Sequence, residues 1–384
     1  MDAFVLAGAI RSQPQEIARL LGSQETQQAA ADAAELFAAA GRVDIVGIGT
    51  SHNAALTAAY LLRSAGIDAN AWSSYDYTLY GEGSAAAGGK PLLLLSHTGG
   101  KQFSRRAFGG PEGERTRPPT SVVVVTGEGD GKSKGEWGPE LEAAPEGSAI
   151  VLRTCEQEVS SMYTVSHLTA MTAVAMIAER ITRGSLGGDA ALAALPAACA
   201  EAVALEPQVA ALAKQWHANC AAGGEIVALG AGPHEPSAHE VEIKIGEAAR
   251  VRCKGYAVEQ YLHGRQIQIQ TTDAFLVFGG PGKALERTQA AARFIAAVQA
   301  RAGAVAPAVV WVGPEGTAPE GTTHLQIPLV HEQLAVIAEA IPGQMLAGHL
   351  AGLEGVDGDS FRMDDDTEDA RAFLQAHIEH IGKL

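Results

Sequence analysis

The fold is decided by two similar stretches, DIVGIG at residues 44–49 and EIVALG at residues 225–230. Each is a short apolar run that ends in glycine, the pattern of a buried strand that enters a tight turn. Strand-like runs follow the first stretch at 91–95, 122–125 and 149–152, and follow the second at 273–278, 309–312 and 324–327. Because the four pairs occur in the same order, the sequence predicts a duplicated unit.

Helical patterns separate these runs, and strands that alternate with helices predict a parallel sheet covered on both faces. A TIM barrel would show more, evenly spaced strands at shorter intervals. We therefore expect an α/β fold with two tandem domains, each of three layers, helix, sheet and helix. The expected divisions are a helical lead-in whose pattern starts near Gln15, a first domain, a helical linker, a second domain and a tail, at residues 1–40, 41–183, 184–222, 223–352 and 353–384.

Composition limits the classes of function. The 384 residues carry a formal net charge of −16, which disfavours a nucleic-acid surface, although a local cluster of cations can still bind a small anion. The four cysteines show no C-x-x-C spacing, as expected for reduced thiols. No cationic start precedes the apolar run at 4–10, and no stretch reaches the ~18 uninterrupted apolar residues of a membrane span. We expect a cytoplasmic protein that binds neither nucleic acid nor membrane.

Hydroxyl-rich loops follow three of the strands predicted in the first half. Ligands of parallel α/β sheets bind at the carboxyl ends of strands, beside the amino termini of helices. Capping of the next helix is the ordinary role of such hydroxyls, but three loops at equivalent strand ends favour an anion site. The candidates are Thr50, Ser51 and His52, then Ser96, His97, Thr98 and Lys101, and finally Ser160 and Ser161.

These loops match neither a nucleotide P-loop nor a dinucleotide-binding fingerprint. The corresponding turn of the second half, GAGPHEPSA at 230–238, lacks the hydroxyl-rich pattern. We therefore expect the first half to hold the anion and the second half to supply other groups.

Glu240, Lys244 and Glu247 are spaced by four and then three residues, so on a helix they share one face. Such a stripe is often an ordinary surface ion pair. Downstream, His263 precedes Gly264, at a helix end or loop where an imidazole could reach a pocket. A carboxylate, a cation and a histidine are the groups that proton transfer between adjacent sugar carbons requires.

At these residues the chain resembles the double sugar isomerase (SIS) domain family, in particular the isomerase half of glucosamine-6-phosphate synthase and related phosphosugar isomerases and deaminases. GIGTSHNAA at 47–55 and SHTGG at 96–100 are similar to the phosphate loops of the family. AHEVEIKIGE at 238–247 is similar to its acid–lysine helix, and LHG at 262–264 to its Lys-His-Gly. The resemblance spans nearly the whole chain.

The resemblance implies a role for each matched residue. Glu247 would move the proton between C1 and C2, and His263 would assist ring opening from the neighbouring subunit of a homodimer. Glu240 and Lys244 would line and orient the site. The phosphate-binding positions are Ser51, Ser96, Thr98 and His97. No metal or cofactor is implied.

Three positions depart from the family pattern. Lys101 stands where the family has threonine, and Arg265 replaces the proline after His-Gly. Asp366 stands near the position of a tail lysine that forms a Schiff base in the synthase. A carboxylate cannot form a Schiff base, and the chain carries no glutaminase sequence, so we expect no glutamine-dependent amination.

The expected function is therefore aldose–ketose isomerisation of a phosphorylated sugar or amino sugar, with or without release of the amine by deamination or deglycation. Three alternatives stay open. One is a sugar-phosphate-sensing protein without turnover. Another is an isomerase of a sulfonated or carboxylated sugar, suggested by Lys101 and Arg265. The weakest is a metal hydrolase built on His234, His239 and Glu240, whose spacing fits no familiar ligand set.

Overall fold

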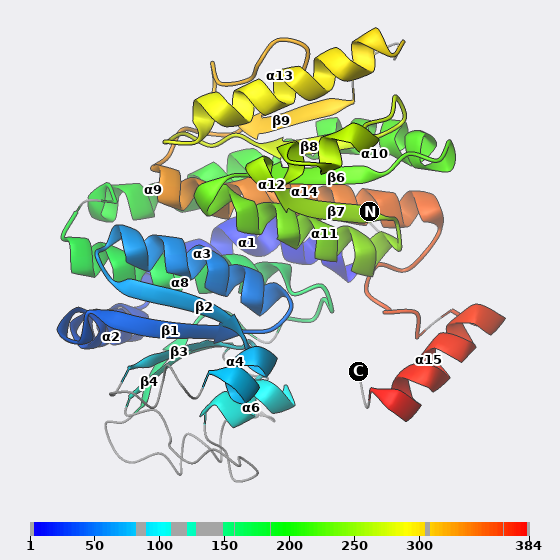
Figure 1. The fold of residues 1–384 in the computed structure, drawn as a ribbon. Helices are drawn as coiled ribbons and strands as arrows, with labels where there is room; N and C mark the ends of the chain where they lie inside the picture. The colour runs from blue at the N-terminus through cyan, green and yellow to red at the C-terminus, as the bar shows by residue number, and fades with distance from the viewer. Residues whose placement is uncertain are drawn as a thin grey trace.

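The computed structural model describes residues 4–81, 90–108, 121–127, 149–156, 158–184, 186–303, 308–363 and 365–381 (Figure 1). In these residues two sheets form, each of five parallel strands, with the orders β2-β1-β3-β4-β5 and β10-β9-β8-β6-β7. The predicted fold class, two tandem α/β domains, is confirmed. The first sheet comprises β1 (Arg42–Gly47), β2 (Asp68–Ser73), β3 (Leu92–Leu95), β4 (Val122–Thr126) and β5 (Ala149–Arg153). The second comprises β6 (Ile226–Gly230), β7 (Cys253–Ala257), β8 (Ala274–Phe278), β9 (Val309–Gly313) and β10 (Thr323–Gln326).

The helices alternate with these strands. The lead-in holds α1 (Val5–Gly22) and α2 (Gln24–Ala40), and the first domain holds α3 (Thr50–Ser64), α4 (Ser74–Tyr80), α6 (Gln102–Phe108) and α8 (Thr164–Thr182). Then come α9 (Gly188–Val203), α10 (Glu206–Ala221), η1 (Gly232–His234), α11 (Glu235–Ala249), α12 (Val258–Leu262), η2 (Arg265–Gln268), α13 (Leu285–Arg301), α14 (Glu332–Glu354) and α15 (Glu368–His380).

Two of the strands, β2 and β7, were not predicted. Each is an edge strand of its sheet: β2 pairs with β1, and β7 pairs with β6. Their sequences, DANAWS and CKGYA, are only partly buried. Because an edge strand pairs on one side and meets less of the core, it needs no continuous apolar run. Sequence periodicity therefore indicated four strands in each half where the structure has five.

The lead-in also differs from the prediction, because α1 begins at Val5 rather than near Gln15. Proline is favoured in the first turn of a helix and is unfavourable in its interior. In the structure Pro14 lies inside α1, whose buried face carries Ile10 and Ile17. Ser23 then caps α2 by accepting a hydrogen bond from the Thr26 backbone N–H.

Each sheet has a different core on each face. In β1, Val43 and Ile45 point into one large cluster, whereas Val46 points into a second cluster with Tyr77 of α4, as the alternation of a strand requires. The outer face of the second sheet packs against α12 and α13. The helices between the two sheets include α1, α3, α8, α11 and α14 (Figure 1).

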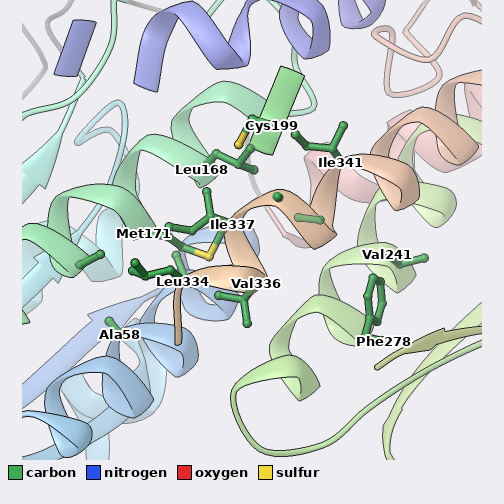
Figure 2. Close-up of a cluster of buried hydrophobic side chains, with 14 of the residues drawn as sticks. Ala58, Leu168, Met171, Cys199, Val241, Phe278, Leu334, Val336, Ile337 and Ile341 are labelled. Carbon is green, nitrogen blue, oxygen red and sulfur yellow. The ribbon is translucent and has the colours of Figure 1, made fainter. Parts of the chain in front are cut away.

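The large cluster joins the two domains. Figure 2 shows Leu168 and Met171 of α8 beside Leu334 and Ile337 of α14. All four side chains are buried, and burial of each such side chain contributes about 1.5–3 kcal/mol. This shared core fixes α11, which packs against both α14 and α3, and so sets the position of Glu240, Lys244 and Glu247 relative to the first domain.

By length and composition α14 could cross a membrane, as could the bent pair α9 and α10 taken together. In the structure, 94% of the apolar window of α14 is buried inside the chain. Its apolarity is therefore explained by its place in the shared core.

Candidate active site

Three charged residues of α11, Glu240, Lys244 and Glu247, form one cluster. Lys244 Nζ lies 3.0 Å from Glu247 Oε2 and 3.6 Å from Glu240 Oε1. Glu240 and Lys244 are 1% and 2% exposed, whereas the Glu247 side chain is 32% exposed. The helix therefore buries an ion pair at its centre and leaves a carboxylate accessible one turn later. This difference in exposure distinguishes the cluster from an ordinary surface ion pair, in which both charged groups are solvated.

The cluster is bound to the first domain through Glu240. Asn53 Nδ2 donates to Glu240 Oε2 at 2.9 Å, and Thr50 Oγ1 donates to Glu240 Oε1 at 3.4 Å. Both donors lie in the first turn of α3, beside Ser51. The predicted anion loop and the predicted acid–base helix therefore meet directly. Asn53 was not among the predicted residues, although its spacing from Thr50 on a helix would have placed the two on one face.

Burial and charge determine the protonation of the cluster. Burial alone would raise the pKa of Glu240, but the His167 ring, Lys244 and the Asn53 amide outweigh it, so that pKa is lowered. Burial would lower the pKa of Lys244, but Glu240 and Glu247 outweigh it and raise that pKa. For Glu247 burial dominates, and its pKa is raised despite Lys244. Glu247 is therefore the carboxylate most ready to accept a proton.

The first two anion loops lie at the carboxyl ends of β1 and β3. Gly47 ends β1, and a Cβ at this position would come within 2.2 Å of the Ser51 carbonyl oxygen, so only glycine permits the close turn into α3. In the second loop Ser96 is buried, and Thr98 Oγ1 accepts from the Gly100 backbone N–H at 3.2 Å. Lys101 is exposed and lowers the pKa of Glu247 electrostatically, which places this loop near the cluster.

Two predicted binding residues, His97 and Ser160, make contacts within the chain, and their contact with a substrate stays a prediction. His97 Nε2 accepts a hydrogen bond from the Glu158 backbone N–H at 3.0 Å, and burial lowers the pKa of His97. Ser160 is 1% exposed and donates to Asp359 Oδ1 at 2.6 Å. These contacts connect the second loop to the segment before α8, and that segment to the tail. Ser161, the neighbour of Ser160, is half-buried.

His52 is half-buried in the first turn of α3. Burial and the nearby His239 lower the pKa of His52, while Asp76 opposes them. His239 in turn lies 3.6 Å from Glu235 on its own helix. Substrate contact by His52 stays a prediction.

His263 and Arg265 lie apart from the cluster within one chain. The His263 side chain is 76% exposed, and its Nε2 is 3.2 Å from Glu259 Oε2. Arg265 stacks over the Tyr256 ring at 4.6 Å and donates to the Gln260 carbonyl oxygen at 3.0 Å. Arg265 also lines a polar cavity of about 570 Å³, and none of the three clustered residues of α11 lines it. The predicted role of His263, which is to enter the active site of the partner subunit in a dimer, is not tested by contacts within one chain.

The tail and the proposed metal ligands have other partners. Asp366 pairs with Arg371 at 2.6 Å and is highly exposed, while its neighbour Asp365 pairs with Arg250 at the end of α11. His234 pairs with the buried Glu339 at 2.6 Å rather than with His239. In the described part of the chain, no group of three His, Cys, Asp or Glu side chains is arranged to hold a metal ion.

Two further residues of the site escaped the sequence interpretation. Glu158 accepts the backbone N–H groups of Thr164, Val165 and Ser166 at 2.6–3.0 Å, which satisfies the first turn of α8 and suits its positive end. His167, in that same turn, is buried against the cluster. Glu158 caps the helix from six residues before Thr164 rather than from the usual capping position. His167 meets the cluster only after α8 packs against α3 and α11.

No protein-family model matches the chain. A curated relative, the isomerising glutamine–fructose-6-phosphate aminotransferase of Neisseria meningitidis serogroup B, is 26% identical over 347 residues, which is 86% of this chain. The chain spans about half (52%) of the length of that relative.

Two solved structures share the fold. The C-terminal domain of glucosamine–fructose-6-phosphate aminotransferase from Francisella tularensis superposes with a TM-score of 0.72 at 17% identity, covering 93% of this chain and 97% of its own. Glucosamine-6-phosphate deaminase from Thermotoga maritima gives a TM-score of 0.67 at 16% identity, covering 93% and 97%. The chain therefore consists of two tandem α/β domains and resembles the isomerase half of glucosamine-6-phosphate synthase in sequence and fold.

Proposed function

We propose that the chain is a phosphosugar isomerase that transfers a proton between C1 and C2 of an open-chain sugar, with Glu247 as the base. The observation that carries the proposal is the contrast within α11. Glu247 is accessible and has a raised pKa, whereas the lysine that neutralises it is almost completely buried. A base of raised pKa accepts a proton near neutral pH and returns it to the adjacent carbon.

The phosphate would bind at the first two loops. The Ser51 hydroxyl and the Thr50 backbone N–H lie in the first turn of α3, at a helix amino terminus, where an anion is favoured. Lys101 adds a cation on the side of Glu247. The hydrogen bonds from Thr50 and Asn53 to Glu240 fix the distance between this loop and α11. Binding of the phosphate would thereby place C1 and C2 against Glu247.

The same step serves two reactions. With a sugar that carries oxygen at C2, removal of one proton gives an enediol, and its return to the neighbouring carbon gives the isomer. With a 2-amino aldose, the product of the proton transfer is an imine at C2, which water hydrolyses to the ketose and the free amine. The relatives include an isomerising aminotransferase and a deaminase, and either outcome is compatible with this cluster.

We further propose a homodimer in which His263 enters the site of the partner. The proposal is supported by the exposed ring of His263, its loop with the exposed Ile267, and the resemblance of LHG to the family motif. Ring opening needs a donor and acceptor near the ring oxygen, which an imidazole provides.

The test is product analysis by NMR. The protein would be incubated separately with fructose 6-phosphate, glucosamine 6-phosphate and a fructosamine 6-phosphate, and the sugars and released amine would be quantified. We expect conversion of at least one sugar, and we expect Glu247→Gln to abolish it while Glu235→Gln, at the start of the same helix, retains it. Binding without conversion of any sugar would instead favour the sensing protein.

A further inference from the structure

The buried pair of His234 and Glu339 lies in the second domain, beside the turns that follow β6 and β8. His234 Nδ1 is 2.6 Å from Glu339 Oε2, and the two side chains are 3% and 0% exposed. His234 ends η1, the short turn between β6 and α11, while Glu339 belongs to α14. The function proposed above uses neither residue.

The turn after β6 has the same backbone geometry as the first anion loop. Gly47 ends β1 and Gly230 ends β6. A Cβ at Gly47 would come within 2.2 Å of the Ser51 carbonyl oxygen. A Cβ at Gly230 would come within 2.1 Å of the His234 carbonyl oxygen. Because the close approach falls four residues after the glycine in both turns, His234 stands where the first domain has Ser51.

The neighbouring strand repeats the arrangement as well. β8 pairs with β6 in the second sheet as β3 pairs with β1 in the first. Gly280 follows β8, and a Cβ on it would come within 2.0 Å of the His234 ring and 2.5 Å of Glu339 Oε1. The imidazole and the carboxylate therefore fill the space between the turns after β6 and β8. In the first domain, the space between the turns after β1 and β3 is the proposed phosphate site.

Glu339 is a carboxylate shut off from solvent, which is costly unless the group is paired. Among the described residues, His234 is the hydrogen-bond partner of Glu339 Oε2, and Glu339 Oε1 has none. Movement of η1 away from α14 would therefore leave the carboxylate unpaired. Because η1 packs against α3 as well as α14, the pair fixes the start of α11 at the boundary between the domains.

We propose that Glu339 is an internal anion of the second domain, which takes the place between β6 and β8 that the substrate phosphate takes between β1 and β3. By holding His234, it positions the start of α11 and thereby the charged cluster of that helix. His234 and Glu339 are positioning residues, and the proposal assigns them no contact with the substrate. It rests on the phosphosugar function proposed above, which assigns the substrate anion to the first domain.

The test removes the internal anion and supplies a free one. Glu339→Ala deletes a group of the size of acetate, whereas Glu339→Gln keeps the shape without the charge. We expect Glu339→Ala to lower the melting temperature by on the order of 5 °C or more, because loss of one partner of a buried pair is strongly destabilising. Sodium acetate, compared with sodium chloride at equal ionic strength, should recover most of this loss by binding the folded state. Glu339→Gln and the wild type, whose sites are filled, should not respond to acetate.

The kinetic constants provide a readout that separates positioning from a merely structural role. Glu339→Ala should lower kcat about tenfold or more, because α11 is displaced from the substrate. The KM for a phosphorylated sugar should stay within about threefold of the wild type, because the phosphate binds at the other domain. Acetate should raise kcat in Glu339→Ala and leave Glu339→Gln unchanged. An increase in KM with unchanged kcat would contradict the positioning of α11.

The variant remains informative if it does not fold in chloride. Its yield of folded protein after refolding in acetate and in chloride would then be compared, and equal yields would overturn the proposal. A folded Glu339→Ala that melts with the wild type, or that responds to acetate no more than Glu339→Gln, would also overturn it. Melting and refolding need no turnover, so failure to convert any sugar would count against the proposed function alone.

Discussion

Lys244 Nζ lies 3.0 Å from Glu247 Oε2 across the boundary between core and solvent, with side chains that are 2% and 32% exposed. The buried member neutralises Glu240 as well, at 3.6 Å. In the proposed function this relationship contributes to both the stability of the site and its chemistry. An ammonium group without solvent is fixed by two carboxylates, and one of these carboxylates remains open to a substrate.

Replacement of the buried lysine should destabilise the fold. Lys244→Met leaves Glu240 and Glu247 without their cation, and the loss of one partner of a buried ion pair costs about 3–5 kcal/mol. Urea unfolding would measure this cost. Lys254→Met is the matched control, because Lys254 forms a solvent-exposed pair with Glu225, and such pairs contribute about 0–1 kcal/mol. Equal midpoints for the two variants would contradict the account of the buried cluster.

The second buried pair predicts a pH dependence of stability. Burial would lower the pKa of His234, but Glu339, at 2.6 Å, outweighs it, so the pKa is raised above the ordinary value of 6.5. A raised folded-state pKa means that the contribution is complete below the unfolded pKa and is lost as the pH rises through the folded pKa. The difference in unfolding free energy between wild type and His234→Gln should therefore shrink from acidic to alkaline pH. A difference that is constant with pH would exclude this linkage.

Lys101 should affect both anion preference and the pH profile. Its charge lowers the pKa of Glu247, so Lys101→Thr should move the acid limb of kcat/KM to higher pH. The same variant should raise KM for phosphorylated sugars, because a cation beside the anion loop is lost. Lys283→Thr, in the loop after β8 of the second domain, is the control and should change neither. A sulfonated sugar assayed in parallel would show whether Lys101 selects a different anion.

A mixture of two inactive variants tests the donation of His263. If His263 acts in the site of the partner, His263→Ala and Glu247→Gln should each be inactive alone. Their mixed dimer would contain one intact site, and random exchange of subunits should restore about a quarter of the wild-type activity. No recovery after unfolding and refolding the mixture together, with a dimer shown by light scattering, would place His263 in the site of its own chain or outside it.

The part of the site that lies within one helix could be predicted from the sequence. The spacing of Glu240, Lys244 and Glu247 fixes their common face once α11 is a helix, and the structure brings them together. The loops after β1 and β3 follow from the rule that parallel strands present their carboxyl ends at one edge. The alternation of apolar runs with helical patterns also indicated both sheets, apart from the edge strands β2 and β7.

The contacts between distant segments could not be predicted. Nothing near Ser160 in the sequence indicates that its hydroxyl donates to Asp359 of the tail, and nothing near His97 indicates its bond to the Glu158 backbone. A serine or a histidine in a loop is equally consistent with binding a substrate and with a hydrogen bond to another part of the chain. His167 is hidden for the opposite reason, because a histidine within an apolar helix carries no sign of the charges that other helices bring to it.

The most direct test of the central claim is solvent exchange in D₂O followed by ¹H NMR. Wild type and Glu247→Gln would be incubated with each phosphorylated sugar, and deuterium at C1 and C2 would be quantified. We predict that the wild type incorporates deuterium into at least one sugar and that Glu247→Gln incorporates none while its melting temperature stays near that of the wild type. Equal incorporation by both proteins would show that Glu247 is not the base.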